Sequence, residues 1–231
     1  MSGPLIFIGI ILTFACVISS IYFMKAYYIK NFKLSVMLKG LAGVFFVLFG
    51  LVKIIATETM TWPIALITVA LLLGLAGDEL LALRHTFKEK YTFYFVVGAL
   101  CFGGEHILLM TSVFLDGIPN LLAILILFGI AVSLSLVYLK TRKTDAGSIH
   151  KSAIFYVCLI SLMCSVMISR VIFAPNLPNL LFALGGLGFI VSDNVLLVYN
   201  FGEKRDWWLN ELVHIAYYGA QLLFGWALFA M

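Results

Sequence analysis

The chain has 231 residues, of which 63% are hydrophobic and only 11% are charged, and its mean hydropathy is +1.11. This composition is typical of an integral membrane protein and excludes a soluble globular core. The formal net charge of +4 does not call for a nucleic-acid partner, because a basic excess on one side of the membrane accounts for it. All cysteines lie in apolar stretches and indicate no disulfide framework; they are Cys16, Cys101, Cys158 and Cys164.

A helix of about 20 apolar residues crosses the hydrocarbon core of a bilayer, which is about 30 Å thick. Eight stretches of the sequence meet this requirement, and the loops between them are short. We therefore predict an all-α protein, a single membrane domain over residues 1–231 built as a bundle of eight transmembrane helices. The predicted spans are 4–24, 34–55, 62–83, 91–114, 119–140, 151–173, 179–201 and 209–230.

Basic residues are confined to alternate loops. The loops after the first, third, fifth and seventh spans are basic, whereas the other three loops carry almost no charge. The positive-inside rule then places the basic loops in the cytosol and both termini outside it. The short loops favour a bacterial inner membrane, with the endoplasmic reticulum as the alternative. The basic residues are Lys25, Lys30, Lys33, Arg84, Lys88, Lys90, Lys140, Arg142, Lys143, Lys151, Lys204 and Arg205.

Ionisable residues lie within several predicted spans. In chain order these are Lys39 in the second span, Asp78 in the third, Glu105 and His106 in the fourth and Asp193 in the seventh. A charged side chain near the centre of a lipid-spanning helix costs about 2.5–3.5 kcal/mol. Pairs of ionisable residues within a membrane also occur as packing contacts between helices. Several ionisable residues at related depths nevertheless favour a functional site.

Polar residues also follow one face of the fourth span and one face of the eighth, at spacings of three and four residues. Glycines precede Asp78 and Asp193, and glycines allow helices to approach closely in lipid. We therefore expect a cavity between the third, fourth, seventh and eighth spans, with both aspartates facing it. The expected supporting residues are Lys39, Tyr94, Glu105, His106, His214, Tyr218 and Gln221.

Four further ionisable residues lie near the ends of spans or in loops. Lys53 and Arg170 lie near the outer ends of their spans, where long basic side chains extend to the interface. His85 and His150 lie at the cytosolic surface or in a loop, so we expect water around them.

The spacing of polar residues favours an internal repeat. Asp78 and Asp193 lie four spans apart, and a polar residue follows each of them by 28 positions, namely His106 and Gln221. Two parallel four-helix halves would produce this pattern.

Four short motifs together resemble the YhhN family of lysoplasmalogenases. They are Gly77–Asp78, His106, Ser192–Asp193 and the sequence YYGAQ at 217–221, and the resemblance covers the whole chain. One departure is that no tyrosine follows His106 closely. The resemblance implies hydrolysis of the vinyl ether bond of a lysoplasmalogen to a fatty aldehyde and a glycerophospho-alcohol, with a lysophospholipid as the substrate and no cofactor.

Cleavage of a vinyl ether begins with protonation of its β-carbon, which gives an oxocarbenium ion that water then attacks. A buried carboxylic acid can deliver the proton, and a nearby carboxylate can stabilise the cation and activate water, as paired carboxylates do in glycosidases. We expect Asp78 and Asp193 to form this pair, and which of them is the acid stays open. Lys39, Arg84 and His85 would receive the phosphate. The chemistry needs no metal.

Two other functions fit parts of the pattern. Membrane carboxylates and an internal repeat also suit a proton-coupled transporter, although the prolines lie outside the interiors of the spans. An intramembrane aspartyl protease also uses two aspartates, but the residue three before Asp78 is Leu75 where glycine is usual, and Ser192 precedes Asp193 where tyrosine is usual. The sequence leaves headgroup preference and oligomeric state open.

Overall fold

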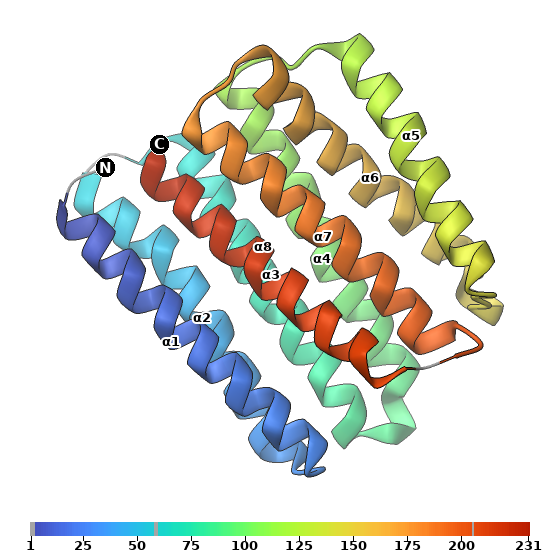
Figure 1. Cartoon of the computed structure of the whole chain (residues 1–231). Coiled ribbons are helices and arrows are strands. Elements are labelled where there is room, and N and C mark those ends of the chain that lie inside the picture. The colour runs from blue at the N-terminus through green and yellow to red at the C-terminus, as the bar shows by residue number, and fades with distance from the viewer. Residues whose placement is uncertain (1–2, 58–59, 205) are drawn as a thin grey trace. The chain divides into compact units, whose positions relative to one another are not determined.

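The structure, a computed structural model, describes residues 3–57, 60–204 and 206–231. Within them the chain forms eight α-helices long and apolar enough to cross a membrane, and no strand, so the predicted fold class is confirmed. Residues 58–59 and Arg205, which belong to loops used for the orientation, lie outside the described residues. The helices are α1 (Gly3–Tyr28), α2 (Phe32–Thr57), α3 (Trp62–Thr86), α4 (Tyr91–Asp116), α5 (Leu121–Thr141), α6 (His150–Phe173), α7 (Leu177–Phe201) and α8 (Trp207–Ala230) (Figure 1).

The chain divides into two compact units, and each is described by itself. The first unit contains residues 1–115 and 225–231, and the second contains residues 116–224. The division between α4 and α5 falls where the sequence predicts the boundary of two four-helix halves. In the first unit α2 packs against α1 and α3, and in the second unit α6 packs against α5 and α7.

The third helix of each half begins in the same way. Proline occupies the first turn of α3 and of α7, where its missing N–H has no helical partner to lose. Asp78 lies 15 residues after Pro63, and Asp193 lies 15 residues after Pro178. The two aspartates therefore occupy equivalent positions in equivalent helices.

The first helix of each half ends in the same way. Lys30 after α1 and Lys143 after α5 adopt left-handed backbone conformations, with φ angles of 58° and 48°. The next amide donates to the carbonyl five residues earlier, Asn31 to Ala26 at 2.9 Å and Thr144 to Leu139 at 3.0 Å. This is the Schellman arrangement that satisfies the last carbonyls of a helix, and its recurrence supports the internal repeat.

The core of the first unit is aromatic and aliphatic. Phe46, Phe49, Ile67, Leu71 and Leu109 are fully buried there. The end of α8 completes this core: Phe49 packs against Phe229 with ring centroids 4.7 Å apart, and Trp226 Nε1 donates to Thr13 Oγ1 at 3.0 Å. The C-terminal end of α8 therefore lies beside the start of α1 (Figure 1).

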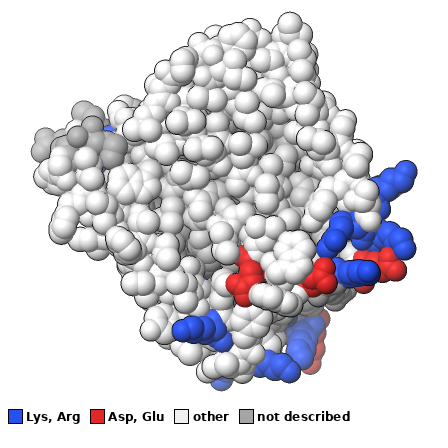
Figure 2. Space-filling model, viewed as in Figure 1, with Lys and Arg blue, Asp and Glu red and all other residues white. Residues whose placement is uncertain are grey.

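The second unit has its own core. A cluster of buried aliphatic residues lies between the last turns of α5 and α7 and the first turns of α6 and α8. Closer to the other end, Phe189 stacks on Phe224, with centroids 5.6 Å apart. Gly188 allows α7 to approach Ala220 of α8, because an added Cβ would lie only 3.0 Å from the Ala220 Cβ. Outside these cores the helices expose broad apolar surface, and the charged side chains visible in Figure 2 lie at helix ends, as expected of a protein in lipid.

Candidate functional site

Asp78 forms a buried ion pair in the first unit. Lys39 Nζ of α2 lies 2.8 Å from Asp78 Oδ1 of α3, and the two side chains are only 6% and 3% exposed. The ammonium also lies 5.7 Å from the centre of the Phe23 ring of α1. Three helices thus surround one charge pair. The expected supporting residue Lys39 and the expected catalytic residue Asp78 therefore lie together in the structure.

A second carboxylate lies beside this pair. Glu79 Oε1 would be 2.7 Å from a Cβ built on Gly40, so the glycine next to Lys39 leaves space for the Glu79 side chain. Sequence analysis assigned no role to Glu79. On the other side of α3, Gly77 and Gly98 bring α3 and α4 together, since a Cβ on Gly98 would lie 3.2 Å from the Gly77 carbonyl. The glycine before Asp78 therefore serves helix packing, as predicted.

Arg84 and His85, at the end of α3, lie among aromatic rings. The Arg84 guanidinium lies 5.3 Å from the ring centres of both Tyr91 and Phe95, and Arg84 Nε donates to His85 Nε2 at 3.3 Å. The imidazole of His85 stacks on Phe32 with centroids 6.0 Å apart. The expectation that His85 is solvated is therefore wrong: it is half-buried and packed against rings.

The predicted residues of α4 fall into two groups. Glu105 and His106 are both completely buried, which agrees with their predicted depth. Tyr94 is half-buried nearer the basic end of α4, where its ring packs against Phe93 and Phe87 with centroids 5.6 and 5.9 Å apart. Tyr94 is therefore part of an aromatic cluster at that end of the unit.

Asp193 in the second unit has a different kind of partner. The Tyr156 hydroxyl of α6 donates to Asp193 Oδ2 at 2.5 Å, and Asp193 is 7% exposed. In both units, then, the second helix of the half supplies the side chain that binds the aspartate of the third helix. The partner is an ammonium for Asp78 and a phenol for Asp193.

Tyr156 was missed by sequence analysis. It lies six residues after the start of α6, a position where tyrosine is usually an interface anchor. The available signal was depth, since Tyr156 and Asp193 lie at comparable distances from the basic ends of their helices.

The residues on either side of Asp193 attach α7 to its neighbours. Ser192 Oγ donates to the Val213 carbonyl of α8 at 3.1 Å. Asn194 Nδ2 donates to Ser135 Oγ of α5 at 3.1 Å. Three successive residues of α7 therefore contact three different helices, which fixes the rotation of α7 and the direction of the Asp193 carboxyl group.

The predicted residues of α8 lie along one stripe, as the spacing indicates. Gln221 is fully buried and its Nε2 donates to the Tyr217 hydroxyl at 3.0 Å. Tyr218 is also buried, and its ring lies 6.4 Å from that of His214, which is half-buried. Gln221 is thus bonded to Tyr217, the first residue of the YYGAQ motif, one turn earlier in its own helix.

The structure contradicts the expectation that Lys53 extends to the interface, and it gives Arg170 a partner near the end of its helix. Lys53 is buried, 6% exposed, and does not extend to the surface. Arg170 pairs with Asp116, with Nη2 and Oδ2 3.1 Å apart. Both residues are therefore part of the packing near the ends of their helices.

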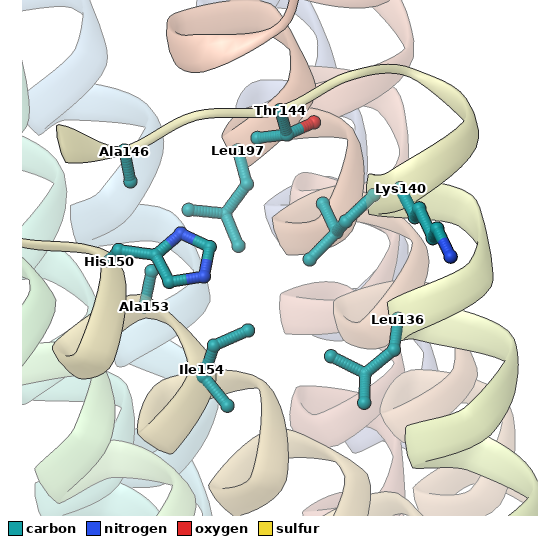
Figure 3. Close-up of a pocket in the computed structure, with 9 residues that line it drawn as sticks. Leu136, Lys140, Thr144, Ala146, His150, Ala153, Ile154 and Leu197 are labelled. Carbon is teal, nitrogen blue, oxygen red and sulfur yellow. The ribbon is translucent and has the colours of Figure 1, made fainter.

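A small cavity lies at the basic end of α5, α6 and α7. It has a volume of about 270 Å³, and the imidazole of His150 points into it between Ile154 and Leu197 (Figure 3). His150 is exposed, as expected. No carboxyl group lines this cavity, so it does not suit the acid–base chemistry expected of the aspartates.

Charge pairs join the loops that follow α5 and α7. Lys143 Nζ and Glu203 Oε2 lie 2.8 Å apart on the surface, and Arg142 Nη2 lies 3.4 Å from Asp206 Oδ2. The hydrogen bond and charge of Lys143 lower the pKa of Glu203 below its usual value of 4.5. Among the described residues, no three His, Cys, Asp or Glu side chains are grouped so that they could hold a metal ion.

Comparison with known families gives one match. A model of the YhhN family matches residues 34–228, most of the chain and both aspartates included. Neither the curated proteins nor the solved structures contain a match.

Proposed function

Because this chain belongs to the YhhN family, we propose that it is a lysoplasmalogenase, which hydrolyses the vinyl ether bond of lysoplasmalogens to a fatty aldehyde and a glycerophospho-alcohol. The observation that carries the proposal is that each half holds one buried aspartate at the same position, bound by a side chain of the preceding helix. Buried carboxyl groups in a membrane protein mark functional sites. Acid–base cleavage of a membrane lipid is a reaction that requires such carboxyl groups.

The reaction needs one proton donor and one carboxylate. A carboxylic acid transfers its proton to the β-carbon of the vinyl ether, and the resulting oxocarbenium ion is stabilised by the negative charge of the other residue. Water attacks the α-carbon and gives its proton to that carboxylate. As the hemiacetal collapses, the carboxyl group that took the proton of water gives it to the departing glycerol oxygen, and the other carboxylate takes the proton of the hemiacetal hydroxyl. Aldehyde and alcohol are released, one water is consumed, and both carboxyl groups return to their initial state.

The ion pair suggests how the two roles are divided. A carboxyl group that binds an ammonium at 2.8 Å does so as a carboxylate. We therefore assign Asp78 the role of stabilising the cation and activating water, and Asp193 the role of proton donor. Tyr156 orients the Asp193 carboxyl group through the hydroxyl that it donates.

The remaining predicted residues have supporting roles. Lys39 balances the charge of Asp78 and holds its carboxylate in position. We propose that the buried polar groups of α4 and α8 position water or the glycerol part of the substrate; they are Glu105, His106, His214, Tyr218 and Gln221, with Tyr94 at the rim. We further propose that the basic loops face the cytosol, and that the phosphate of the substrate approaches from that side.

The test is to incubate the purified protein in detergent with a lysoplasmalogen, a lysophospholipid with an ester bond and one with a saturated ether bond. Only the first should release a product, a fatty aldehyde. In heavy water the aldehyde should carry one deuterium on the carbon next to the carbonyl, because the enzyme protonates that carbon. Release of fatty acid from the ester lipid, or no product from any of them, would contradict the proposal; a proton-coupled transporter would give no aldehyde.

A double variant tests whether the aspartates act together. Asp78→Asn and Asp193→Asn should each reduce turnover by about a hundredfold or more. If both residues serve the same chemical step, the double variant should be little worse than either single variant, since residues that act as a unit have non-additive effects. Multiplicative losses would indicate independent roles.

A further inference from the structure

The second unit has an apolar groove that faces the surrounding lipid. It lies between α5, α6, α7 and the first turns of α8, has a volume of about 530 Å³, and extends along α5 from Leu127 to Tyr138. We call it the α5–α7 groove. Its rim residues Ile130, Leu134 and Val191 are 52%, 66% and 44% exposed, so a molecule in the bilayer can enter from the side.

The groove is apolar along its length and polar at one end. Asn194 and Ser135 line it near the basic ends of α7 and α5, together with Tyr138 and Trp208. Asn194 is only 7% exposed, and its Nδ2 donates to the Ile190 carbonyl at 2.7 Å and to Ser135 Oγ at 3.1 Å. A carbonyl oxygen can only accept a hydrogen bond, so the atom of the Asn194 side chain that contacts the Ile190 carbonyl must be the amide nitrogen. The other atom, Oδ1, has no hydrogen-bond partner in the part of the chain that the structure describes.

The length of the groove matches one lipid chain. Leu127 and Tyr138 are 11 residues apart in α5, which corresponds to about 16 Å at a rise of 1.5 Å per residue. Two opposed lipid chains span a hydrocarbon core of about 30 Å, so one chain is about 15 Å long. A volume of about 530 Å³ is also within the range of ligand sites, roughly 300–1,000 Å³.

We propose that the α5–α7 groove binds the hydrocarbon chain of the substrate, a lipid with a single chain, and that Asn194 Oδ1 accepts a hydrogen bond from its free glycerol hydroxyl. This inference rests on the proposed function for the identity of the lipid. The vinyl ether is at the headgroup end of the alkenyl chain, and the polar end of the groove is formed by Asn194, the residue that follows Asp193. A chain in the groove therefore places its reactive end at the turn of α7 that carries the proposed acid.

The same features explain selection of a lysolipid over the abundant diacyl lipids. In a bilayer a chain gains no hydrophobic free energy by entering a protein groove, because lipid tails are as apolar as leucine. Selection must then come from shape and from polar contacts. A lysolipid has one chain, which one groove accommodates, and a free hydroxyl, which satisfies a buried acceptor; a diacyl lipid has a second chain and lacks the hydroxyl.

Binding can be tested without turnover through Trp208, which lines the groove. The probe is a lysolipid with a saturated ether-linked chain brominated near its middle, added to the protein in lipid nanodiscs. We expect it to quench a component of the fluorescence that is missing in Trp208→Phe. A diacyl lipid with the same brominated chain at equal concentration should quench this component much less. Equal quenching by the two lipids would overturn the proposal, because Trp208 would then report only the surrounding bilayer.

Two pairs of variants test the chain site and the hydroxyl site. Ala131→Phe places a ring inside the groove, whereas Gly129→Phe, two residues earlier in α5, places the same ring where an added Cβ meets no atom within 4 Å. Ala131→Phe should lower kcat/KM for chains of 16 to 18 carbons by about tenfold or more relative to chains of 8 to 10, since displacement of a reacting group by about 1 Å costs up to a hundredfold. Gly129→Phe should leave this ratio unchanged. The same shift in both variants, or in neither, would overturn the chain site.

Asn194→Leu removes the acceptor, and Ser135→Ala removes only the contact between the two side chains. We expect Asn194→Leu to weaken binding of the brominated lysolipid by about tenfold and Ser135→Ala to weaken it less than threefold, because a lost hydrogen bond inside a site corresponds to about 0.5–1.5 kcal/mol. Equal affinity of Asn194→Leu and the parent would overturn the role of Asn194. If lysolipid binds selectively but no aldehyde is ever released, the groove stands as a lysolipid site and the proposed enzymatic function fails.

Discussion

The ion pair between Lys39 and Asp78 permits a test that separates stability from catalysis. Asp78→Asn removes the carboxylate and leaves the ammonium of Lys39 buried without its partner at 2.8 Å. Asparagine is nearly isosteric with aspartate, so the sequence alone suggests a harmless substitution. The structure predicts the opposite, because breaking a buried ion pair on one side leaves an uncompensated charge.

The size of the expected loss of stability depends on how deep Lys39 lies within its helix. It lies seven residues into α2, which starts at Phe32, or about 10 Å along the helix. Breaking a buried pair costs about 3–5 kcal/mol, and a charge at the centre of a span costs about 2.5–3.5 kcal/mol, less where a long side chain can reach the interface. We expect Asp78→Asn to lower the free energy of unfolding by about 2–3 kcal/mol. Lys39→Met/Asp78→Asn should recover to within about 1 kcal/mol of the parent, since neither member of the pair is then charged.

The assay combines unfolding in mixed micelles with turnover of a lysoplasmalogen. The double variant should regain stability but stay at least about a hundredfold less active, because the carboxylate is still missing. Lys39→Gln and Lys140→Gln form a matched pair of controls: the first should be unstable and the second, at an exposed position in the last turn of α5, should match the parent. If the double variant is as unstable as Asp78→Asn alone, the two residues do not form the pair. If it regains activity, Asp78 is not catalytic.

Three further outcomes are expected. Asp193→Asn should lose about a hundredfold or more of turnover with little loss of stability, because asparagine can still accept the hydroxyl of Tyr156, and a parent-like rate would exclude Asp193 as the acid. A cysteine at Ser148, in the loop between α5 and α6, should react with an impermeant reagent only from the cytosolic side; labelling from outside would reverse the orientation. Lys143 lowers the pKa of Glu203, so their contact stabilises the protein at pH values above the usual carboxyl pKa of 4.5, and this stabilisation is lost as the pH falls through the lowered pKa. Glu203→Gln should therefore remove a small pH-dependent part of the stability in acid and leave activity unchanged.

The spans could be predicted from the sequence because the physical requirement is simple. Each needs about 20 apolar residues to cross the hydrocarbon core, and the helices observed contain every predicted span except for one or two residues at their ends, such as the start of α5 at Leu121. The burial of Asp78, Asp193, Glu105 and His106 was predictable as well, because ionisable side chains within a span almost always face the interior of the bundle.

The partners of the aspartates were not predictable in the same way. A partner is set by how neighbouring helices rotate about their axes, and a helix that is apolar on all sides gives no pattern from which to read that rotation. Tyr156 therefore resembled an interface anchor, and Lys53 resembled a side chain that extends to water, whereas the structure binds the first to Asp193 and buries the second. Glycines gave the most information, because Gly77 and Gly188 mark close approaches of helices.

The two halves place an aspartate at the same position and differ in the side chain that binds it, so exchanging that side chain should exchange its chemistry. Tyr156→Phe removes only the hydroxyl that orients Asp193, and a hydrogen bond between neutral groups contributes about 0.5–1.5 kcal/mol; we expect turnover to fall by about twofold to tenfold. Tyr156→Lys instead gives Asp193 the partner that Asp78 has. An ammonium holds the carboxyl group as a carboxylate, so Asp193 would have no proton to donate, and turnover should fall further than in Tyr156→Phe. Glutamine at the same position is the neutral control, because it donates a hydrogen bond without a charge and should restore activity above that of the phenylalanine variant. If the lysine variant is as active as the glutamine variant, the role of Asp193 does not depend on its carrying a proton, and the division of labour between the two aspartates is wrong.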